Sequence, residues 1–296
     1  IIIGAGSEVL LSMISDLLGH QQIIGVENPG YHKSFKRLKN KHELIPIAIR
    51  KEGMDYEQII HQHIDILHVT PSHQFPTGVV MSIQNRLKLI SWAHQKDNRF
   101  IIEDDYDSEF RFLGQPIEAL YALDHNGKVI YLNSFSKSLA PGMRLSYMVL
   151  PQRLLKDYQE KLQHGYQSVS NLTQFTLKAF MEEGWFYRHL NKMKVRYKQK
   201  RDELIKAFKQ SQFGSLIYIE NADAGLHFIL RHQKIDASTL KKQALKEGVF
   251  IKSLKDFLFM PDEGFNDALV IGYAHLNLDD LNEIMIRLNR AWCDIS

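Results

Sequence analysis

One lysine stands in a hydroxyl-rich turn that directly follows an apolar, β-like run. The run covers residues 129–132, and the turn contains Ser134, Ser136 and Lys137, with Arg144 seven residues beyond the lysine. A neutral lysine amine forms a Schiff base with an aldehyde, and two serines with an arginine can bind a phosphate dianion. The stretch therefore predicts a site for an aldehyde cofactor that carries a phosphate, although it fits a plain serine-rich turn with a surface lysine equally well.

Further positions supply what pyridoxal 5'-phosphate requires of a protein. Asp104 can face the pyridine nitrogen, and Tyr106, two residues on along the same strand face, can hydrogen-bond the ring oxygen. Tyr31 can stack on the ring, or simply pack at the start of a helix. Gly6 and Ser7 lie in a glycine turn whose backbone N–H groups can bind the phosphate, although such a turn is also an ordinary helix cap.

Two neighbouring polar groups allow other interpretations. The acidic run at residues 103–107 could bind a metal, but it lacks paired histidines at ligand spacing, so we expect no metal site. His73, in the loop at residues 71–78, could act as a general base, but a hydrogen-bonding role within the loop is the better interpretation.

Strands and helices are expected to alternate in the first half of the chain. Strands are predicted at 1–3, 23–27, 44–48, 64–69, 99–103 and 129–132, with a further segment at 145–150, and helices at 9–18, 31–42, 56–61 and 81–96. This alternation predicts an α/β fold with a mostly parallel sheet and helices on both faces. Ligands of such sheets bind beyond the carboxyl ends of the strands, where Asp104 and Lys137 can meet.

After residue 150 the pattern changes to long helices and paired strands. Helices are predicted at 151–162, 172–183, 186–209, 237–247 and 279–291, and strands at 215–220, 226–230, 249–251 and 268–273. We expect a large domain over residues 1–184 and a smaller α+β domain over residues 185–296. The helix at 186–209 contains nine lysines and arginines, which favours a solvated face over a nucleic-acid-binding one.

The composition is that of an ordinary globular protein. The chain of 296 residues is 44% hydrophobic and 24% charged, and no apolar run approaches the roughly 18 residues that span a bilayer. The single Cys293 excludes an intrachain disulfide and a multi-cysteine zinc site, and it suits a reducing, cytoplasmic compartment. The net charge of +3 is weak evidence for a nucleic-acid partner. We therefore expect a cytoplasmic protein that does not enter the membrane.

Three sequence strings together resemble one family. They are Pro-Ser-His-Gln-Phe-Pro-Thr-Gly at 71–78, Glu-Asp-Asp-Tyr-Asp-Ser-Glu-Phe at 103–110 and Ser-Phe-Ser-Lys-Ser-Leu at 134–139. The chain resembles, over nearly its whole length, the aminotransferase-like domain of the MocR or GabR-type regulators of the GntR superfamily. The resemblance implies an aminotransferase fold of type I that binds pyridoxal 5'-phosphate.

The resemblance also implies roles for the residues singled out above. Lys137 would form the internal aldimine, Asp104 would pair with the pyridine nitrogen, Tyr106 would contact the ring oxygen, Tyr31 would stack and Arg144 would help to hold the phosphate. Such proteins form homodimers, and they contact DNA through a winged helix-turn-helix module. We expect that module, and the first part of the large domain, to precede residue 1.

Two positions depart from the aminotransferase pattern. Phe75 stands where aminotransferases usually have an asparagine that contacts the ring oxygen, and Val270 aligns with an arginine that binds the substrate carboxylate. A valine cannot pair with a carboxylate. The departures favour a PdxR-type sensor of pyridoxal 5'-phosphate itself, hence of vitamin B6 status, more than an enzyme. An active aminotransferase, and a regulator that senses an amino acid or a γ-aminobutyrate-like amine, remain alternatives.

Overall fold

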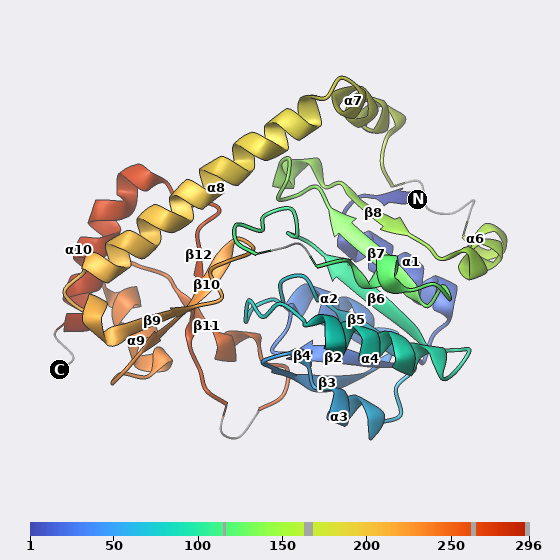
Figure 1. Ribbon diagram of the computed structural model, residues 1–296, viewed down its shortest axis with the longest axis horizontal. Coiled ribbons are helices and arrows are strands. Elements are labelled where there is room, and N and C mark those ends of the chain that lie inside the picture. Colours follow the sequence, from blue (N-terminus) through green and yellow to red (C-terminus); the bar gives the residue numbers. More distant parts are fainter. Residues whose placement is uncertain (115–116, 163–167, 262–264, 294–296) are drawn as a thin grey trace.

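The computed structural model describes residues 1–114, 117–162, 168–261 and 265–293. Within these residues the strands form an eight-stranded and a four-stranded sheet. Figure 1 shows the two sheets beside one another, with the long helix α8 (Trp185–Gln210) running from the small sheet on the left toward helix α7 (Asn171–Glu182) at the upper right. None of the described helices is long and apolar enough to cross a membrane.

The large sheet is mixed, with its parallel strands in the middle. The order is β1-β8-β7-β6-β5-β2-β3-β4. Strands β7, β6, β5, β2 and β3 run parallel to one another, whereas β8 pairs antiparallel with β7 and β1, and β4 pairs antiparallel with β3. The predicted α/β fold with a mostly parallel sheet is confirmed. The strand bounds are β1 Ile2–Gly4, β2 Ile23–Asn28, β3 Glu43–Arg50, β4 Gly53–Met54, β5 Ile66–Val69, β6 Phe100–Asp105, β7 Val129–Ser134 and β8 Ser146–Val149.

Helices cover both faces of the large sheet because successive strand side chains point to opposite sides. In β6, Ile102 packs in one apolar core with Leu10, whereas Ile101 packs in another with Trp92. The first core includes α1 (Ser7–Leu18), α2 (His32–Lys39) and α6 (Leu155–Lys161); the second includes α3 (Tyr56–Ile60), α4 (Ile83–His94) and α5 (Leu120–Leu123). The two cores make the sheet a rigid support for side chains at its edge.

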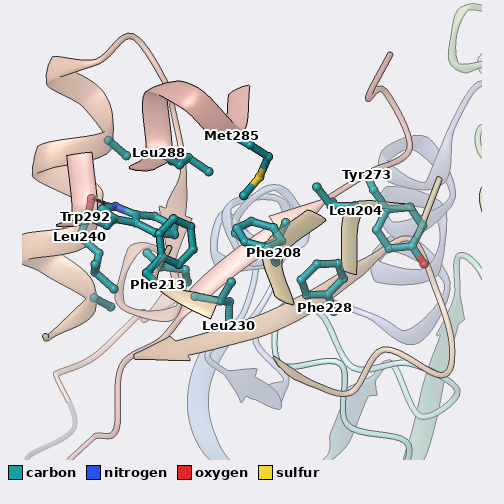
Figure 2. Close-up of a cluster of buried hydrophobic side chains, with 14 of the residues drawn as sticks. Leu204, Phe208, Phe213, Phe228, Leu230, Leu240, Tyr273, Met285, Leu288 and Trp292 are labelled. Atoms are coloured by element: carbon teal, nitrogen blue, oxygen red, sulfur yellow. Dashed lines mark hydrogen bonds between the residues drawn. The ribbon is translucent and has the colours of Figure 1, made fainter. Parts of the chain in front are cut away.

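The small sheet is antiparallel and packs against its own helices. Its order is β11-β12-β10-β9, with bounds β9 Ile217–Glu220, β10 His227–His232, β11 Lys252–Ser253 and β12 Leu269–Gly272. Helices α8, α9 (Ala237–Lys246) and α10 (Leu281–Cys293) contribute to a core rich in aromatic rings, shown in Figure 2. There the Trp292 indole N–H donates to the Leu240 carbonyl at 3.0 Å, which satisfies a buried polar group.

Several predicted elements differ from the structure. The strand predicted at 249–251 is wrong, because Gly248 turns with a φ of +76° and the Val249 N–H donates to the Ala244 carbonyl at the end of α9. The helix predicted to reach residue 42 ends at Lys39. Strand β4 and helix α5 were not predicted. Short 3₁₀ turns, also not predicted, lie at Pro141–Met143, Gln152–Leu154, Gly214–Leu216, Leu254–Phe257 and Leu278–Asp280.

The division of the chain into domains at residues 184 and 185 stays a prediction. Helix α8 begins at Trp185, as that division requires. However, Phe110 from the first range packs in the core of the small sheet, with its ring perpendicular to that of Tyr197 at a centroid distance of 4.9 Å. The segment after β6 therefore joins the two sheets.

Candidate functional site

The residues predicted to bind the cofactor come together at one edge of the large sheet. Asp104 is near the carboxyl end of β6, and Ser134 ends β7. Ser146 is in register with both Ser134 and Gly4, so β7 and β1 end at the same level. Tyr31 follows the end of β2. This is the edge beyond which ligands of parallel sheets bind.

Gly6, Ser7 and Arg144 form the end of the site predicted to hold the phosphate. Gly6 has a φ of +100°, and a Cβ on it would lie 2.6 Å from Arg144 Nη2, so the guanidinium packs directly against the glycine backbone. The Gly6 N–H donates to the Gly4 carbonyl at 2.8 Å. The Ser7 N–H, at the first residue of α1, has no acceptor among the described residues. A helix start with a free N–H beside an arginine suits an anion.

Ser134 and Ser136 brace the turn that contains Lys137. The Ser136 N–H donates to Ser134 Oγ at 3.2 Å, and the two hydroxyls are 2.9 Å apart. Lys137 is half-buried, and within the described part of the chain its amine has no hydrogen-bond or ion-pair partner. Its charge helps to lower the pKa of His227, after the larger effects of burial and of His73. The amine therefore lies within electrostatic reach of His227 in β10 of the small sheet.

Asp104 and Tyr31 lie at the end predicted to hold the pyridine ring. Asp104 Oδ2 is 3.5 Å from His68 Nε2 on the neighbouring strand β5. Burial raises the pKa of Tyr31, as do the charges of Glu8 and Asp104, whereas Arg144 opposes the rise. Tyr31 therefore lies within electrostatic reach of both ends of the site.

Tyr106 is the last of the predicted site residues. Its hydroxyl oxygen is 3.1 Å from His73 Nδ1. Burial raises the pKa of the phenol well above its usual value, and the charges of Asp107, Glu27 and Asp104 raise it further. The phenol therefore stays protonated at physiological pH and can serve as a hydrogen-bond donor.

Sequence reasoning missed the buried carboxylate that holds the loop at residues 71–78. Glu27 is 4% exposed and accepts from the Thr70 N–H at 2.9 Å, from the Thr70 hydroxyl and from Gln74 Nε2 at 3.1 Å. Gln74 Nε2 also donates to the Pro29 carbonyl, and its Oε1 accepts from the Thr77 N–H and hydroxyl. The glutamine of the loop motif was the available signal, because a buried amide requires partners.

Phe75 and Val270 occupy apolar surroundings. The Phe75 ring is surrounded edge-on by the rings of Tyr31, Tyr106, His227 and Phe257, at centroid distances of 5.7, 6.3, 5.4 and 5.0 Å. Val270 packs partly buried against a small apolar cluster in the small sheet. Neither position offers the hydrogen bond or the charge found there in the aminotransferase pattern.

Acidic residues at the end of β6 and directly after it line a separate cavity of about 520 Å³. Its walls include Asp105, Asp107 and Glu109, together with Arg86 and Arg111, but not Lys137 or Asp104. Burial raises the pKa of Glu109 to about 7, with a contribution from the charges of Asp105 and Asp107. Among the described residues no group of three or more histidine, cysteine, aspartate or glutamate side chains could hold a metal ion.

A lysine, an aspartate and a helix start beside an arginine lie at this sheet edge, which is the combination predicted for a pyridoxal 5'-phosphate site. The family model for aminotransferase class I and II matches residues 1–288, so the chain belongs to that family. Pyridoxal 5'-phosphate is the cofactor that this family implies.

Two of the similar proteins are HTH-type transcriptional regulators. The HTH-type transcriptional regulator YhdI of Bacillus subtilis is 38% identical over the whole of this chain and 62% of its own length. The HTH-type pyridoxine biosynthesis regulator PdxR of Corynebacterium glutamicum is 28% identical over 98% of this chain and 62% of its own. These relatives confirm the resemblance to the MocR-type regulators. The chain spans about 62% of their length.

A solved structure shows the same fold. The kynurenine aminotransferase of Pyrococcus horikoshii, determined in complex with PMP, matches 99% of this chain and 74% of its own with a TM-score of 0.82 and 25% identity. The expected type I aminotransferase fold is thereby confirmed.

Proposed function

We propose that this chain is the effector domain of a transcriptional regulator, and that it senses pyridoxal 5'-phosphate by binding it covalently at Lys137. The observation that carries the proposal is the meeting of Lys137, Asp104, Tyr106 and Arg144 at one sheet edge in a relative of HTH-type regulators. Bound there, the cofactor supplies an aldehyde that a neutral lysine amine can hold. Each side chain then has a separate task.

The phosphate would lie against the Ser7 N–H, the hydroxyls of Ser134 and Ser136 and the Arg144 guanidinium, with Gly6 leaving room for that guanidinium. Such a set of donors suits a dianion, because each phosphate oxygen can accept a hydrogen bond from it.

The ring would lie between Tyr31 and the end of β6. Asp104 would hold the proton on the pyridine nitrogen, and the His68 imidazole at 3.5 Å would keep the carboxylate in place. The Tyr106 phenol would donate to the ring oxygen. Tyr31, whose own ring is braced edge-on by Phe75, would stack on the face.

The choice of the cofactor itself as the signal is supported by Phe75 and Val270. Phe75 is enclosed by aromatic rings, and Val270 packs in an apolar cluster, so neither can fix the polar groups of an amino-acid substrate. One relative is named for control of pyridoxine biosynthesis, which agrees with a vitamin B6 signal in this chain. The signal would reach DNA through a winged helix-turn-helix module outside these residues.

The first experiment is an absorption spectrum of the protein with pyridoxal 5'-phosphate, followed by borohydride reduction and mapping of the modified residue. We expect a yellow band and a reduced adduct at Lys137. Lys137→Ala is expected to abolish both, whereas Lys156→Ala, at an exposed lysine of α6, is expected to leave both unchanged. A colourless wild-type protein would contradict cofactor binding at this site.

The second experiment separates the signals. DNA affinity of the whole regulator is measured with and without pyridoxal 5'-phosphate, and cofactor-free protein is titrated calorimetrically with amino acids and γ-aminobutyrate. We expect the cofactor alone to change DNA affinity. Tight amine binding with no effect of the cofactor on DNA affinity would instead support the amine-sensing alternative.

The aminotransferase alternative is favoured by the completeness of the lysine site and by the kynurenine aminotransferase fold. In that case Lys137 would also move a proton between the substrate and the cofactor. Loss of the yellow band on adding an amino acid, followed by rapid recovery with a keto acid, would favour the enzyme. A slow or absent half-reaction is what the sensor proposal expects.

The proposal includes a cytoplasmic homodimer. Large apolar side chains are exposed on α7 and at the start of α8: Leu172 and Tyr187 are 78% and 66% exposed, and Phe175 is 68% exposed. A second copy would cover these side chains. Sedimentation of the purified protein would test this, and a monomer at micromolar concentration would contradict it.

A further inference from the structure

His73 lies where the loop at 71–78 meets the segment that leads into β10. Its ring is 1% exposed. Its Nδ1 is 3.0 Å from Asp107 Oδ2 and 3.1 Å from the Tyr106 hydroxyl oxygen, so one nitrogen faces two oxygens. An imidazole nitrogen carries at most one hydrogen, so these contacts restrict where the protons lie.

The Asp107 carboxylate determines which group donates the hydrogen bond between His73 and Asp107. The carboxylate is 1% exposed and, when ionised, can only accept, so Nδ1 at 3.0 Å must carry a hydrogen. A nitrogen that carries a hydrogen cannot accept one, so the Tyr106 hydroxyl at 3.1 Å cannot donate to His73 and keeps its own hydrogen for another partner. The tautomer of His73 is thus assigned from the partners of its ring nitrogen.

We propose that His73 is a positioning residue that directs the Tyr106 hydroxyl hydrogen away from Asp107 and toward the bound cofactor. The inference rests on the proposed function in one respect, the presence of the cofactor beside Tyr106. Asp107 Oδ2 and the Tyr106 hydroxyl oxygen lie 3.0 and 3.1 Å from the same His73 nitrogen, so the carboxylate is a nearby acceptor that competes for the hydroxyl hydrogen. Without His73 the phenol would donate to that charged acceptor, which forms a stronger hydrogen bond than a neutral one does.

Gly225 holds His73 in place from the other side. It has a φ of +69°, and a Cβ on it would lie 1.9 Å from His73 Cε1 and Nδ1. Two hydrogen bonds fix the backbone of the glycine: its N–H donates to the Phe110 carbonyl at 2.8 Å, and its carbonyl accepts from the Tyr273 hydroxyl at 2.5 Å. Tyr273 belongs to the small-sheet core in Figure 2, so the position of His73 depends on that sheet.

His227 is the other titratable group against His73, with ring centroids 4.5 Å apart. Its Nε2 lies 3.0 Å from the Pro76 carbonyl, which can only accept, so that nitrogen carries the hydrogen. Burial holds the pKa of His227 well below its usual value. His227 therefore stays neutral and adds no titration of its own near physiological pH.

A double-mutant cycle in the cofactor-bound protein tests the role of His73. The variants are Tyr106→Phe, His73→Phe, which keeps the ring volume, and both together; the readouts are cofactor affinity and the pH at which the absorption band shifts. We expect each single change to weaken binding about tenfold and to move that pH in the same direction. The double variant should resemble Tyr106→Phe. Effects that add, or an unchanged spectrum in His73→Phe, would overturn the inference.

The glycine supplies a test from the other sheet. Gly225→Ala is expected to reproduce the spectral change of His73→Phe. The matched control is Gly184→Ala, because Gly184 has a similar φ of +75° but nothing within 4 Å of its Cβ position. Equal spectral effects of the two alanines would show that backbone strain, and not displacement of His73, causes the change.

A third measurement does not need the cofactor. In protein labelled with ¹⁵N-histidine, NMR is expected to find His73 neutral or charged with a hydrogen on Nδ1, and Asp107→Asn is expected to shift that signal. A His73 that carries its hydrogen only on Nε2 would refute the inference. If the wild type proves colourless with pyridoxal 5'-phosphate, the proposed function fails, and this measurement still decides the proton arrangement.

Discussion

The two ends of the candidate site are built in different ways. At the phosphate end, Gly6, Ser7 and Arg144 are held by short turns directly after or before a strand, and Arg144 is exposed to solvent. At the ring end, Tyr106 depends on its neighbour Asp107 and on His73 and Gly225, which come from distant segments, and all three of these residues are buried. The phosphate end therefore has an exposed charged group, whereas the ring end is a buried network of polar side chains.

This difference has consequences for substitution. Exposed donors around an anion act nearly independently, and water replaces any one that is lost. Members of a buried network leave their partners unsatisfied when they are removed, which costs about 1–3 kcal/mol per group. We therefore expect changes at the ring end to affect folding and binding together, and changes at the phosphate end to affect binding mainly.

The largest effect is expected for Glu27→Ala. The change would leave the Thr70 N–H, the Thr70 hydroxyl and Gln74 Nε2 without their buried acceptor. We expect a loss of about 3 kcal/mol in the free energy of unfolding, together with weaker cofactor binding, because the loop with Phe75 loses its support. Denaturant unfolding and cofactor titration measure the two effects.

Glu52→Ala is the control for that change, since Glu52 is exposed in a turn. It should alter the free energy of unfolding by no more than about 0.5 kcal/mol. A Glu27→Ala variant as stable as Glu52→Ala would mean that the buried network contributes little, and the contrast between the two ends of the site would disappear.

A smaller effect is expected from Glu109 in the acidic cavity at the end of β6. The pKa of Glu109 rises from 4.5 to about 7 in the folded protein, mainly through burial. A raised pKa means that the folded state holds its proton longer than the unfolded state does. The stability from this group is therefore complete below about pH 4.5 and is lost as pH rises toward 7.

Glu109→Gln removes this titration. Between pH 5 and 8 we expect the wild type to lose about 2 kcal/mol of unfolding free energy relative to the variant, as one raised carboxyl pKa predicts. Glu103, whose pKa burial also raises to about 7, is present in both proteins and cancels in the difference. Parallel pH profiles for the two proteins would show that Glu109 does not titrate in this range.

The same contrast explains how much the sequence could predict. The turns around Lys137, Arg144 and Gly6 were predictable because each follows from a few neighbouring residues, a strand and a helix start. The parallel sheet with helices on both faces followed from the alternation of apolar segments and is confirmed. Strand 249–251 was mispredicted because an apolar triplet cannot reveal the left-handed turn at Gly248.

The buried polar contacts around the loop at residues 71–78 could not be predicted from the sequence, for a physical reason. Glu27 and Gln74, like His73 and Gly225, are far apart along the chain, and only the packed fold decides which buried polar groups meet. The interpretation of His73 as a hydrogen-bonding loop residue agrees with its contact to Asp107. Gly225 gave no signal, because a lone glycine before a strand is common in turns and loops of every kind.

The smallest effect on folding is expected for Gly6→Ala, at the phosphate end. The new Cβ would lie 2.6 Å from Arg144 Nη2, but this atom is the far end of a flexible, exposed side chain that can move aside. The φ of +100° adds backbone strain, so we expect a loss of about 1 kcal/mol in stability and, since Arg144 is displaced, about tenfold weaker cofactor binding. Gly142→Ala is the control, because nothing lies within 4 Å of its Cβ position. If Gly6→Ala instead lowers stability as much as Glu27→Ala, folding depends on the phosphate end as strongly as on the buried network, and the contrast between the two ends of the site is wrong.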